Sequence, residues 1–411
     1  MSKKLCALLL LACLIGTSVA MAAPQPKEFK LGFITSLSGQ FAAVGETQRK
    51  GTQLAVDQVN ARGGLNMPWG KVKVSLLVKD DEAKLDVGVR RYRELVSAGI
   101  HAVVGTTWNP MAGAINEETK ITPMPYLASC VPALDSFRKG NAAEGTFSVA
   151  FTPWSIGYLT GASVVKELGK KKIFFVSRAD SWGKTIYEGL QAALKEHGGE
   201  VIGFAEYPQG NVDFSAAINQ AKAAKPDIFI ACQFGGDAIA LFKQAYDMGL
   251  YAQTTMFNTF ITNVVAKGLP ENALKDLYAL NFSYYNLDGF EDKAVAASMK
   301  TFTDEHMKAF GEPPDSYGTI AYIAAKIIFE AVEKTGSVDP TVVSKYIQNT
   351  TFQTVKGEGK FREDKEMVGK YMAFVVKGKA MSERKDPADV FKVLGYFGGD
   401  AALPSLKSLG Y

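Results

Sequence analysis

The sequence predicts a two-lobed α/β protein in which each lobe is a doubly wound, largely parallel sheet. Short apolar stretches of strand length alternate with longer stretches of helical periodicity, which is typical of an α/β sheet. The alternation runs once before residue 150 and starts again at Pro153, so two similar units are expected. With 411 residues and 47% hydrophobic content, the chain is long enough to bury two cores.

The first unit has four expected strands separated by helices and turns. Its first helix has an apolar face through Leu54, Ala55 and Val59, and the pair Gly63-Gly64 ends it. We expect strands over residues 29–36, 72–78, 101–104 and 124–128, and helices over residues 45–61, 85–98 and from 109 onward.

The second unit repeats this pattern from Pro153 to residue 282. Its expected strands are residues 172–176, 200–207, 226–232, 254–257 and 277–282, and its helices are residues 183–197, 213–224 and 235–248. Beyond it we expect helices over residues 288–309, 316–334 and 339–348, and then hairpin strands within residues 352–377. No pattern places the C-terminal tail, residues 396–411.

Residues 1–22 are predicted to be a secretory signal peptide. Lys3 and Lys4 precede an uncharged apolar run, residues 5–15, and small residues then lead to Ala22, after which cleavage is expected. The mature protein would be exported. Two alternatives stay open: an uncleaved membrane anchor, which the polar residues after the run disfavour, and lipidation at Cys13.

Charge and cysteine content narrow the function classes. The formal net charge is +4, and export would remove two lysines, which leaves the mature chain close to neutral. No basic block stands out, so neither nucleic acid nor an anionic membrane is predicted as a partner. Two of the four cysteines would leave with the signal peptide; Cys130 and Cys232 remain, and they can pair or stay free.

The stretch from His101 to Asn116 is the first candidate for a binding site. A short buried strand leads into a turn at Trp108, and Asn109-Pro110 is typical of a helix start, with Asn at the N-cap and Pro at the first helical position. Unpaired N–H groups and the positive end of the helix dipole favour an anion there. The alternative is an ordinary βα turn with a packing Trp.

The sequence lacks the motifs of catalysis. There is no phosphate-binding glycine loop after the first strand and no G-x-S-x-G motif. The three histidines, His101, His197 and His306, have no metal-ligand spacing, and the adjacent carboxylate pairs are expected in turns or on the surface. No metal, cofactor or enzymatic activity is therefore predicted, and binding is favoured over catalysis.

Long stretches resemble the periplasmic substrate-binding proteins of ABC importers, of the leucine/isoleucine/valine-binding type. The opening, LGFITSLSGQFAAVGETQRKGTQLAVDQVNARGGLN from Leu31 to Asn66, is similar to that family's first strand, polar loop and helix. Residues 74–105 resemble its second strand, D-D turn and following helix, and YPQGNVDFS in the second unit matches a distinctive family phrase. The order and spacing of these matches hold over much of the chain.

The resemblance implies two α/β lobes with a ligand cleft between them, joined by three chain crossings near residues 147–153, 281–286 and 352–357. Lobe 1 would contain residues 23–149 and 284–354, and lobe 2 residues 150–283 and 355–395. The implied function is capture of a small amino acid or related carboxylate by closure of the lobes, followed by delivery to an ABC permease in the inner membrane. An extracellular ligand sensor of the same fold is the alternative from another class.

The resemblance also implies site residues. The family binds the ligand carboxylate at the start of a first-lobe helix, where this chain has Asn109 beside Trp108, and the loop after the next strand matches Ser129 and Cys130. On the second lobe the matching residues are Trp182, Gln233 and Phe234, and Tyr317 resembles an aromatic wall residue. Phe234 and Tyr317 also fit core positions, and Gln233 also fits a solvent-facing one.

One position departs from the family pattern. A carboxylate after the strand at residues 254–257 normally accepts the ligand ammonium, but this chain has Asn258 there. Burying an unpaired ammonium costs on the order of several kcal/mol. Either Asp180 or Asp237 binds the ammonium, or the ligand is an aromatic or aliphatic acid or an amide.

Overall fold

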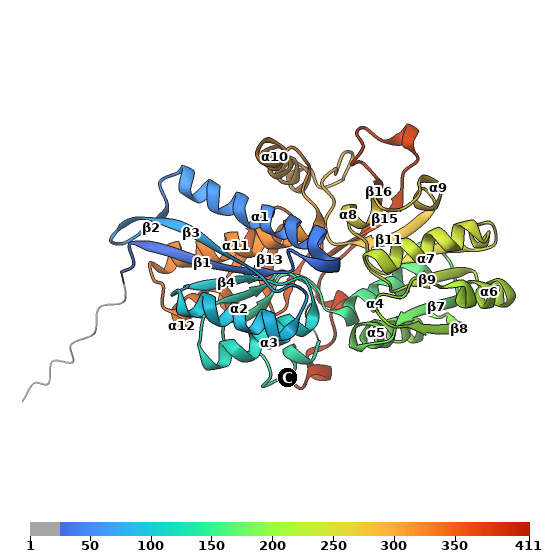
Figure 1. Ribbon diagram of the computed structural model, residues 1–411, viewed down its shortest axis with the longest axis horizontal. Helices are drawn as coiled ribbons and strands as arrows, with labels where there is room; N and C mark the ends of the chain where they lie inside the picture. Colours follow the sequence, from blue (N-terminus) through green and yellow to red (C-terminus); the bar gives the residue numbers. More distant parts are fainter. Residues whose placement is uncertain (1–24, 131, 133) are drawn as a thin grey trace, which may run out of the picture.

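The computed structural model describes residues 25–130, 132 and 134–411, which form two lobes side by side along the long axis of the molecule (Figure 1). The predicted signal peptide and Cys13 lie outside the described residues. Within the described part of the chain, no helix combines the length and apolarity needed to cross a bilayer.

The first lobe is built on a six-stranded sheet with the order β2-β3-β1-β4-β5-β6, in which β2 is antiparallel to β3 and the other pairs are parallel. Its strands are β1 (Glu28–Thr35), β2 (Leu65–Met67), β3 (Gly70–Asp80), β4 (Ala102–Gly105), β5 (Tyr126–Ala128) and β6 (Thr146–Ser148). Parallel strands end at the same edge of a sheet. The turns after β1, β4 and β5 therefore lie next to one another.

Helices cover both faces of this sheet. Helices α1 (Ala42–Ala61) and α11 (Ser316–Thr335) lie on one face, and α2 (Leu85–Ser97) and α3 (Asn109–Ile121) on the other. Alternate side chains of a strand point to opposite faces, so Phe33 joins the core with α1 whereas Ile34 joins the core with α2 and α3. Helices α10 (Lys293–Phe310) and α12 (Pro340–Asn349) pack against α1 and α11 respectively.

The second lobe is built on a seven-stranded sheet with the order β16-β15-β11-β10-β9-β7-β8. Its strands are β7 (Lys172–Arg178), β8 (Glu200–Tyr207), β9 (Ile228–Ala231), β10 (Thr255–Asn258), β11 (Leu277–Asn281), β15 (Ala373–Gly378) and β16 (Phe391–Phe397), and the last two join antiparallel. Its helices are α4 (Pro153–Ala162), α5 (Ser181–His197), α6 (Ser215–Ala224), α7 (Gly236–Asp247), α8 (Asn263–Ala266) and α9 (Glu271–Leu274). Two doubly wound sheets in one chain confirm the predicted fold class.

The chain around the predicted third crossing forms a small sheet of its own. The sequence places the crossing at residues 352–357 and assigns residues 355–395 to lobe 2, but β12 (Thr351–Thr354), β13 (Gly357–Phe361) and β14 (Met367–Gly369) form a separate antiparallel sheet. Strand β13 contacts α10 and α12, and the Phe361 ring lies 5.0 Å from that of Phe147 between centroids. The chain thus enters the second sheet only after Gly369. A hairpin pattern shows that one face is apolar but not which core that face covers.

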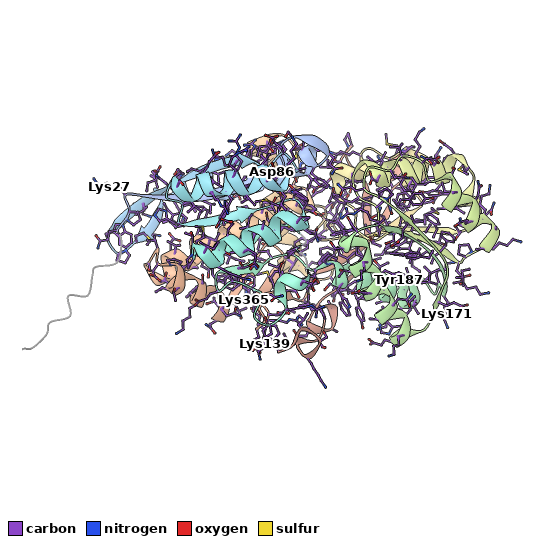
Figure 2. All side chains as sticks on the ribbon, turned by 60° about the horizontal axis from the view of Figure 1, so that its bottom comes forward. Lys27, Asp86, Lys139, Lys171, Tyr187 and Lys365 are labelled. Carbon is purple, nitrogen blue, oxygen red and sulfur yellow. The ribbon has the colours of Figure 1, made fainter. Side chains whose placement is uncertain are left out.

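After β16, the tail that the sequence could not place leaves the second sheet and packs on the first lobe. Two short 3₁₀ helices, Asp400–Ala402 and Leu406–Leu409, end where the chain terminus lies in Figure 1. The Leu409 carbonyl accepts a hydrogen bond from Lys139 N at 2.9 Å, and Tyr411 Oη donates to the Phe137 carbonyl at 3.3 Å. Figure 2 shows Lys139 on the first lobe, on the same side as Lys365. The tail therefore connects the two lobes in addition to the crossings.

Removing residues 398–411 is expected to lower the melting temperature by about 5–10 °C, because Leu403 and Leu409 would each lose burial worth about 1.5–3 kcal/mol. Circular dichroism during heating measures this change. Lys407→Ala, at an exposed position of the same tail, is the control and should leave the melting temperature unchanged. A truncated protein that melts with the full chain would show that the tail contributes nothing to stability.

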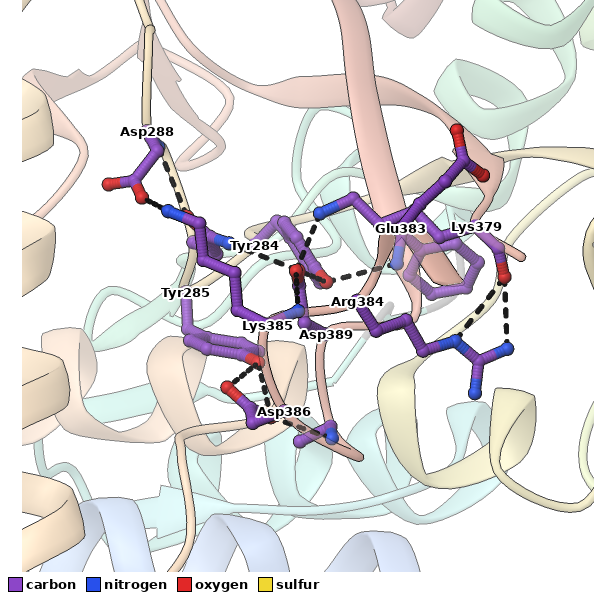
Figure 3. A network of polar contacts seen from close by, with 12 residues as sticks. Tyr284, Tyr285, Asp288, Lys379, Glu383, Arg384, Lys385, Asp386 and Asp389 are labelled. Carbon is purple, nitrogen blue, oxygen red and sulfur yellow. Dashed lines mark hydrogen bonds and ion pairs between the residues drawn. The ribbon is translucent and has the colours of Figure 1, made fainter. Parts of the chain in front are cut away.

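A polar network centred on Asp389 holds the second crossing (Figure 3). The buried Asp389 carboxylate accepts hydrogen bonds from Tyr284 Oη at 2.8 Å, Asn286 Nδ2 at 3.0 Å and Lys379 Nζ at 2.6 Å. Burial acts to raise the pKa of Asp389, but the Lys379 contact and the other hydrogen bonds outweigh it and hold the pKa below its usual range. The crossing is thus fixed to the loop that precedes β16.

Candidate functional site

A buried polar network fixes the turns at the carboxyl edge of the first sheet. Gln48 on α1 donates through Nε2 to the carbonyl oxygens of Thr106 at 2.9 Å and Ser129 at 2.6 Å. The same nitrogen lies 3.2 Å from Ser129 Oγ, which leaves the hydroxyl proton of this predicted site residue available to another acceptor. Asp81 accepts from Ser36 Oγ at 2.6 Å and Thr106 Oγ1 at 2.8 Å. These bonds hold the ends of β1, β4 and β5 in one rigid arrangement.

The start of α3 differs from the prediction by one residue. The N-cap is Trp108 and not Asn109, which is the first helical residue, with Pro110 after it in the first turn. The pattern fits both alignments because proline is compatible with either of the first helical positions. Asn109 is 8% exposed, and its Nδ2 has no hydrogen-bond partner among the residues that the structure describes. The same holds for Nε1 of the half-buried Trp108.

On the second lobe, the end of β7 and the start of α5 bring Arg178 and Trp182 together. The Arg178 guanidinium lies 5.3 Å from the centroid of the Trp182 ring, a distance suited to a cation–π contact. Asp180 caps α5 by accepting from Gly183 N at 3.1 Å, and its other oxygen accepts from Arg178 Nε at 2.6 Å. Trp182 is 6% exposed, and its Nε1 has no partner among the described residues.

The ends of β9 and β10 place Gln233 and Asn258 side by side. Gln233 donates through Nε2 to the Ser177 carbonyl at 3.0 Å, whereas its Oε1 is unpaired within the described chain. Asn258 donates through Nδ2 to the Gln233 carbonyl at 3.3 Å and accepts from Phe260 N at 2.9 Å. Asn258 therefore fixes the loop that follows β10, with both ends of its amide engaged.

An aromatic group lies where α11 meets the second lobe. The rings of Phe234, Phe260 and Tyr317 are 6.0–6.1 Å apart between centroids. Burial raises the pKa of Tyr317, the charges of Cys130 and Asp315 raise it further, and Arg178 acts in the opposite direction. Tyr317 is thus within electrostatic reach of Cys130 at the end of β5 and of Arg178 at the end of β7.

The two candidate ammonium partners are both engaged by the protein. Asp180 pairs with Arg178 and caps α5, as described above. Asp237, in the first turn of α7, accepts from Gly210 N at 2.8 Å. Burial raises the pKa of Asp237, and the contacts from Gly210 and Arg178 only partly oppose this. Both carboxylates therefore already have partners within the protein.

The two cysteines of the described chain are buried free thiols, which answers the question that the sequence left open. Burial raises the pKa of Cys130 to about 12 and that of Cys232 to about 11. The thiolate is the reactive form, so both groups are poor nucleophiles at neutral pH. Within the described residues, no group of three or more His, Cys, Asp or Glu side chains is arranged to hold a metal ion.

Of the predicted site residues, the structure brings Phe234 close to Tyr317, with ring centroids 6.0 Å apart, and it places Trp182 under Arg178. Trp108 and Asn109 lie on the first lobe and make no side-chain hydrogen bond to this group within the described chain. The sequence reasoning missed Arg178 and Gln48. Gln48 could have been found, because it is a polar residue on the otherwise apolar, buried face of α1. Arg178 could not, because an arginine at a strand end is common on protein surfaces.

Three comparisons show what the chain is similar to. A family model described as periplasmic binding protein matches residues 28–381. A Leu/Ile/Val-binding protein homologue of Brucella suis is 22% identical over 363 residues, which cover 84% of this chain and 87% of the relative. The crystal structure of an amino acid ABC transporter substrate-binding protein from Pseudomonas fluorescens has a TM-score of 0.84 at 23% identity, with 94% of this chain and 99% of that chain covered. A solute-binding protein from R. palustris in complex with benzoate has a TM-score of 0.77 at 20% identity, covering 92% and 99% respectively.

Proposed function

Because the chain belongs to the periplasmic binding protein family, we propose that it captures a small amino acid or related carboxylate between its two lobes and delivers it to the permease of an ABC importer. Export through the N-terminal signal peptide would place it in the periplasm, where it meets the solute. Closure of the two lobes over the solute supplies the form that the permease recognises.

The observation that carries this proposal is a set of unpaired buried polar atoms at the strand ends and helix starts of both lobes. Trp108 Nε1 and Asn109 Nδ2 belong to the first lobe, and Trp182 Nε1 and Gln233 Oε1 to the second; each lacks a partner among the described residues. A buried polar group without a hydrogen bond costs about 1–3 kcal/mol. Three of the four atoms are donors, so a ligand rich in acceptor oxygens can satisfy them.

The start of α3 supports a carboxylate as the ligand group on the first lobe. Backbone N–H groups of the first helical turn have no partners within the helix, and the helix dipole favours negative charge there. The first turn of α3 contains no acidic residue that would occupy this position. The Asn109 amide adds a side-chain donor at the same point.

A thermal-shift screen tests the proposal. A ligand present at about a hundred times its dissociation constant should add about 2.7 kcal/mol to the stability of the folded state. We expect at least one member of a panel of amino acids, aromatic acids, aliphatic acids and amides to raise the melting temperature, whereas a sugar of similar size should not. Failure of every member of the panel to stabilise the purified protein would contradict the proposed function.

A further inference from the structure

The guanidinium of Arg178 has more hydrogen-bonding capacity than the fold uses. Its side chain is only 12% exposed, and its one hydrogen bond within the described residues runs from Nε to Asp180. An arginine carries five N–H donors in a planar fork. The two terminal nitrogens, Nη1 and Nη2, are therefore left for a partner outside the described chain.

The guanidinium of Arg178 lies near side chains that carry unpaired polar atoms. It lies over the Trp182 ring, whose Nε1 is unpaired. Gln233, whose Oε1 is unpaired, donates to the carbonyl of Ser177, the residue before Arg178. The Arg178 charge acts to lower the pKa of Tyr317, against the larger opposite effect of burial. A positive charge thus borders the aromatic group on the second lobe.

The carboxylates of the same region already accept hydrogen bonds from the protein; Asp315 accepts from Val264 N and Tyr317 N, both at 3.1 Å. Asn258, at the end of β10, is a neutral amide with both of its ends bonded to the backbone. The two oxygens of Asp180 accept from Gly183 and Arg178, and Asp237 accepts from Gly210. A ligand ammonium buried here would meet a guanidinium and no unpaired carboxylate, which is the costly arrangement for a charge.

We propose that the ligand is an organic anion without an ammonium group, an aromatic or apolar aliphatic carboxylate, and that Arg178 binds an anionic oxygen of it through its terminal nitrogens. This inference rests on the proposed function, since it names the ligand class of the same site. The guanidinium fork matches the two oxygens of a carboxylate. The Trp182, Phe234 and Tyr317 rings then accommodate the apolar part.

The test is isothermal titration calorimetry with matched probes: leucine, 4-methylpentanoate and 4-methylpentanamide, and likewise phenylalanine and 3-phenylpropanoate. In the unmodified protein we expect a carboxylate to bind at least tenfold more tightly than the amino acid or amide of the same skeleton. Arg178→Gln should weaken binding of that carboxylate at least 30-fold, and Arg178→Lys should restore part of the loss. Arg90→Gln, at an exposed position on α2, removes the same charge away from the site and is the control.

The outcomes separate this inference from the proposed function. Leucine or phenylalanine bound as tightly as its carboxylate analogue would overturn the inference and leave the proposed function intact. So would unchanged carboxylate affinity in Arg178→Gln, even if the variant melts at a lower temperature, because Arg178 would then only support Asp180. If no probe binds the unmodified protein, the inference fails; if every compound of the thermal-shift panel also fails to stabilise it, the proposed function fails as well.

Discussion

Replacing Gly51 with leucine is expected to lower the free energy of unfolding of the first lobe by about 3 kcal/mol or more. Helices α1 and α11 cross at this residue, and a Cβ on Gly51 would lie 2.0 Å from the Gly318 carbonyl oxygen. A backbone carbonyl cannot rotate out of the way as a side chain can, so the two helices must separate. Overpacking costs about 1–3 kcal/mol even where no backbone atom clashes. Urea unfolding followed by circular dichroism measures the loss.

Gly113→Ala on α3 is the matched control. The nearest heavy atom to a Cβ there is Ser136 Oγ at 3.9 Å, an ordinary contact distance. Alanine in a helix interior should therefore raise stability by about 0.4–1 kcal/mol. Equal stability of Gly51→Leu and the unmodified protein would mean that α1 and α11 are not in the close contact described here. Because Tyr317 lies in the first turn of α11, separation of the two helices should also weaken ligand binding.

Trp182→Ala is expected to weaken binding of the ligand about 30- to 150-fold while the fold is retained. The Trp182 ring lies beside the Arg178 guanidinium, 5.3 Å from it, and apolar ligand surface that packs on the ring is worth about 2–3 kcal/mol, which corresponds to that change in affinity. The variant also removes the unpaired Nε1 donor. Calorimetric titration with the ligand found in the thermal-shift screen provides the measurement.

Trp69→Ala is the control for this variant. Trp69 lies between β2 and β3 in the first lobe, where its Nε1 donates to the Pro26 carbonyl at 3.2 Å. It should cost some stability but leave the affinity unchanged. If Trp182→Ala binds the ligand as the unmodified protein does, then the second lobe contacts the ligand elsewhere.

The architecture could be predicted from the sequence because it depends on local patterns. Strands buried on both faces, such as β9 with Ile228, Phe229 and Ile230, produce continuous apolar runs, and helices α1 and α11 have the expected periodicity. The third crossing and the tail could not be predicted. Both depend on contacts between distant residues, Phe361 with Phe147 and Leu409 with Lys139, that no local pattern encodes.

The candidate site also has a part that the sequence predicts and a part that depends on contacts made only in the folded chain. The resemblance led to Trp182, Gln233, Phe234 and Tyr317; of these, the structure places the rings of Phe234 and Tyr317 6.0 Å apart, and their role in binding stays a prediction. The hydrogen bonds that occupy Asp180 and Asp237 were not predictable, because each partner is a backbone N–H group or a side chain brought near by folding. The unbonded terminal nitrogens of Arg178 could not be predicted for the same reason. The sequence shows a charged residue but not which hydrogen bonds the folded protein makes to it.

The most direct test of two lobes closing on a solute is a crystal structure of the protein with the tightest ligand from the screen. We expect the ligand between the start of α3 and the start of α5, in contact with Asn109, Trp182 and Arg178, with the two lobes enclosing it. A ligand bound outside this region, for example against α10 and the β12–β14 sheet, would contradict the account.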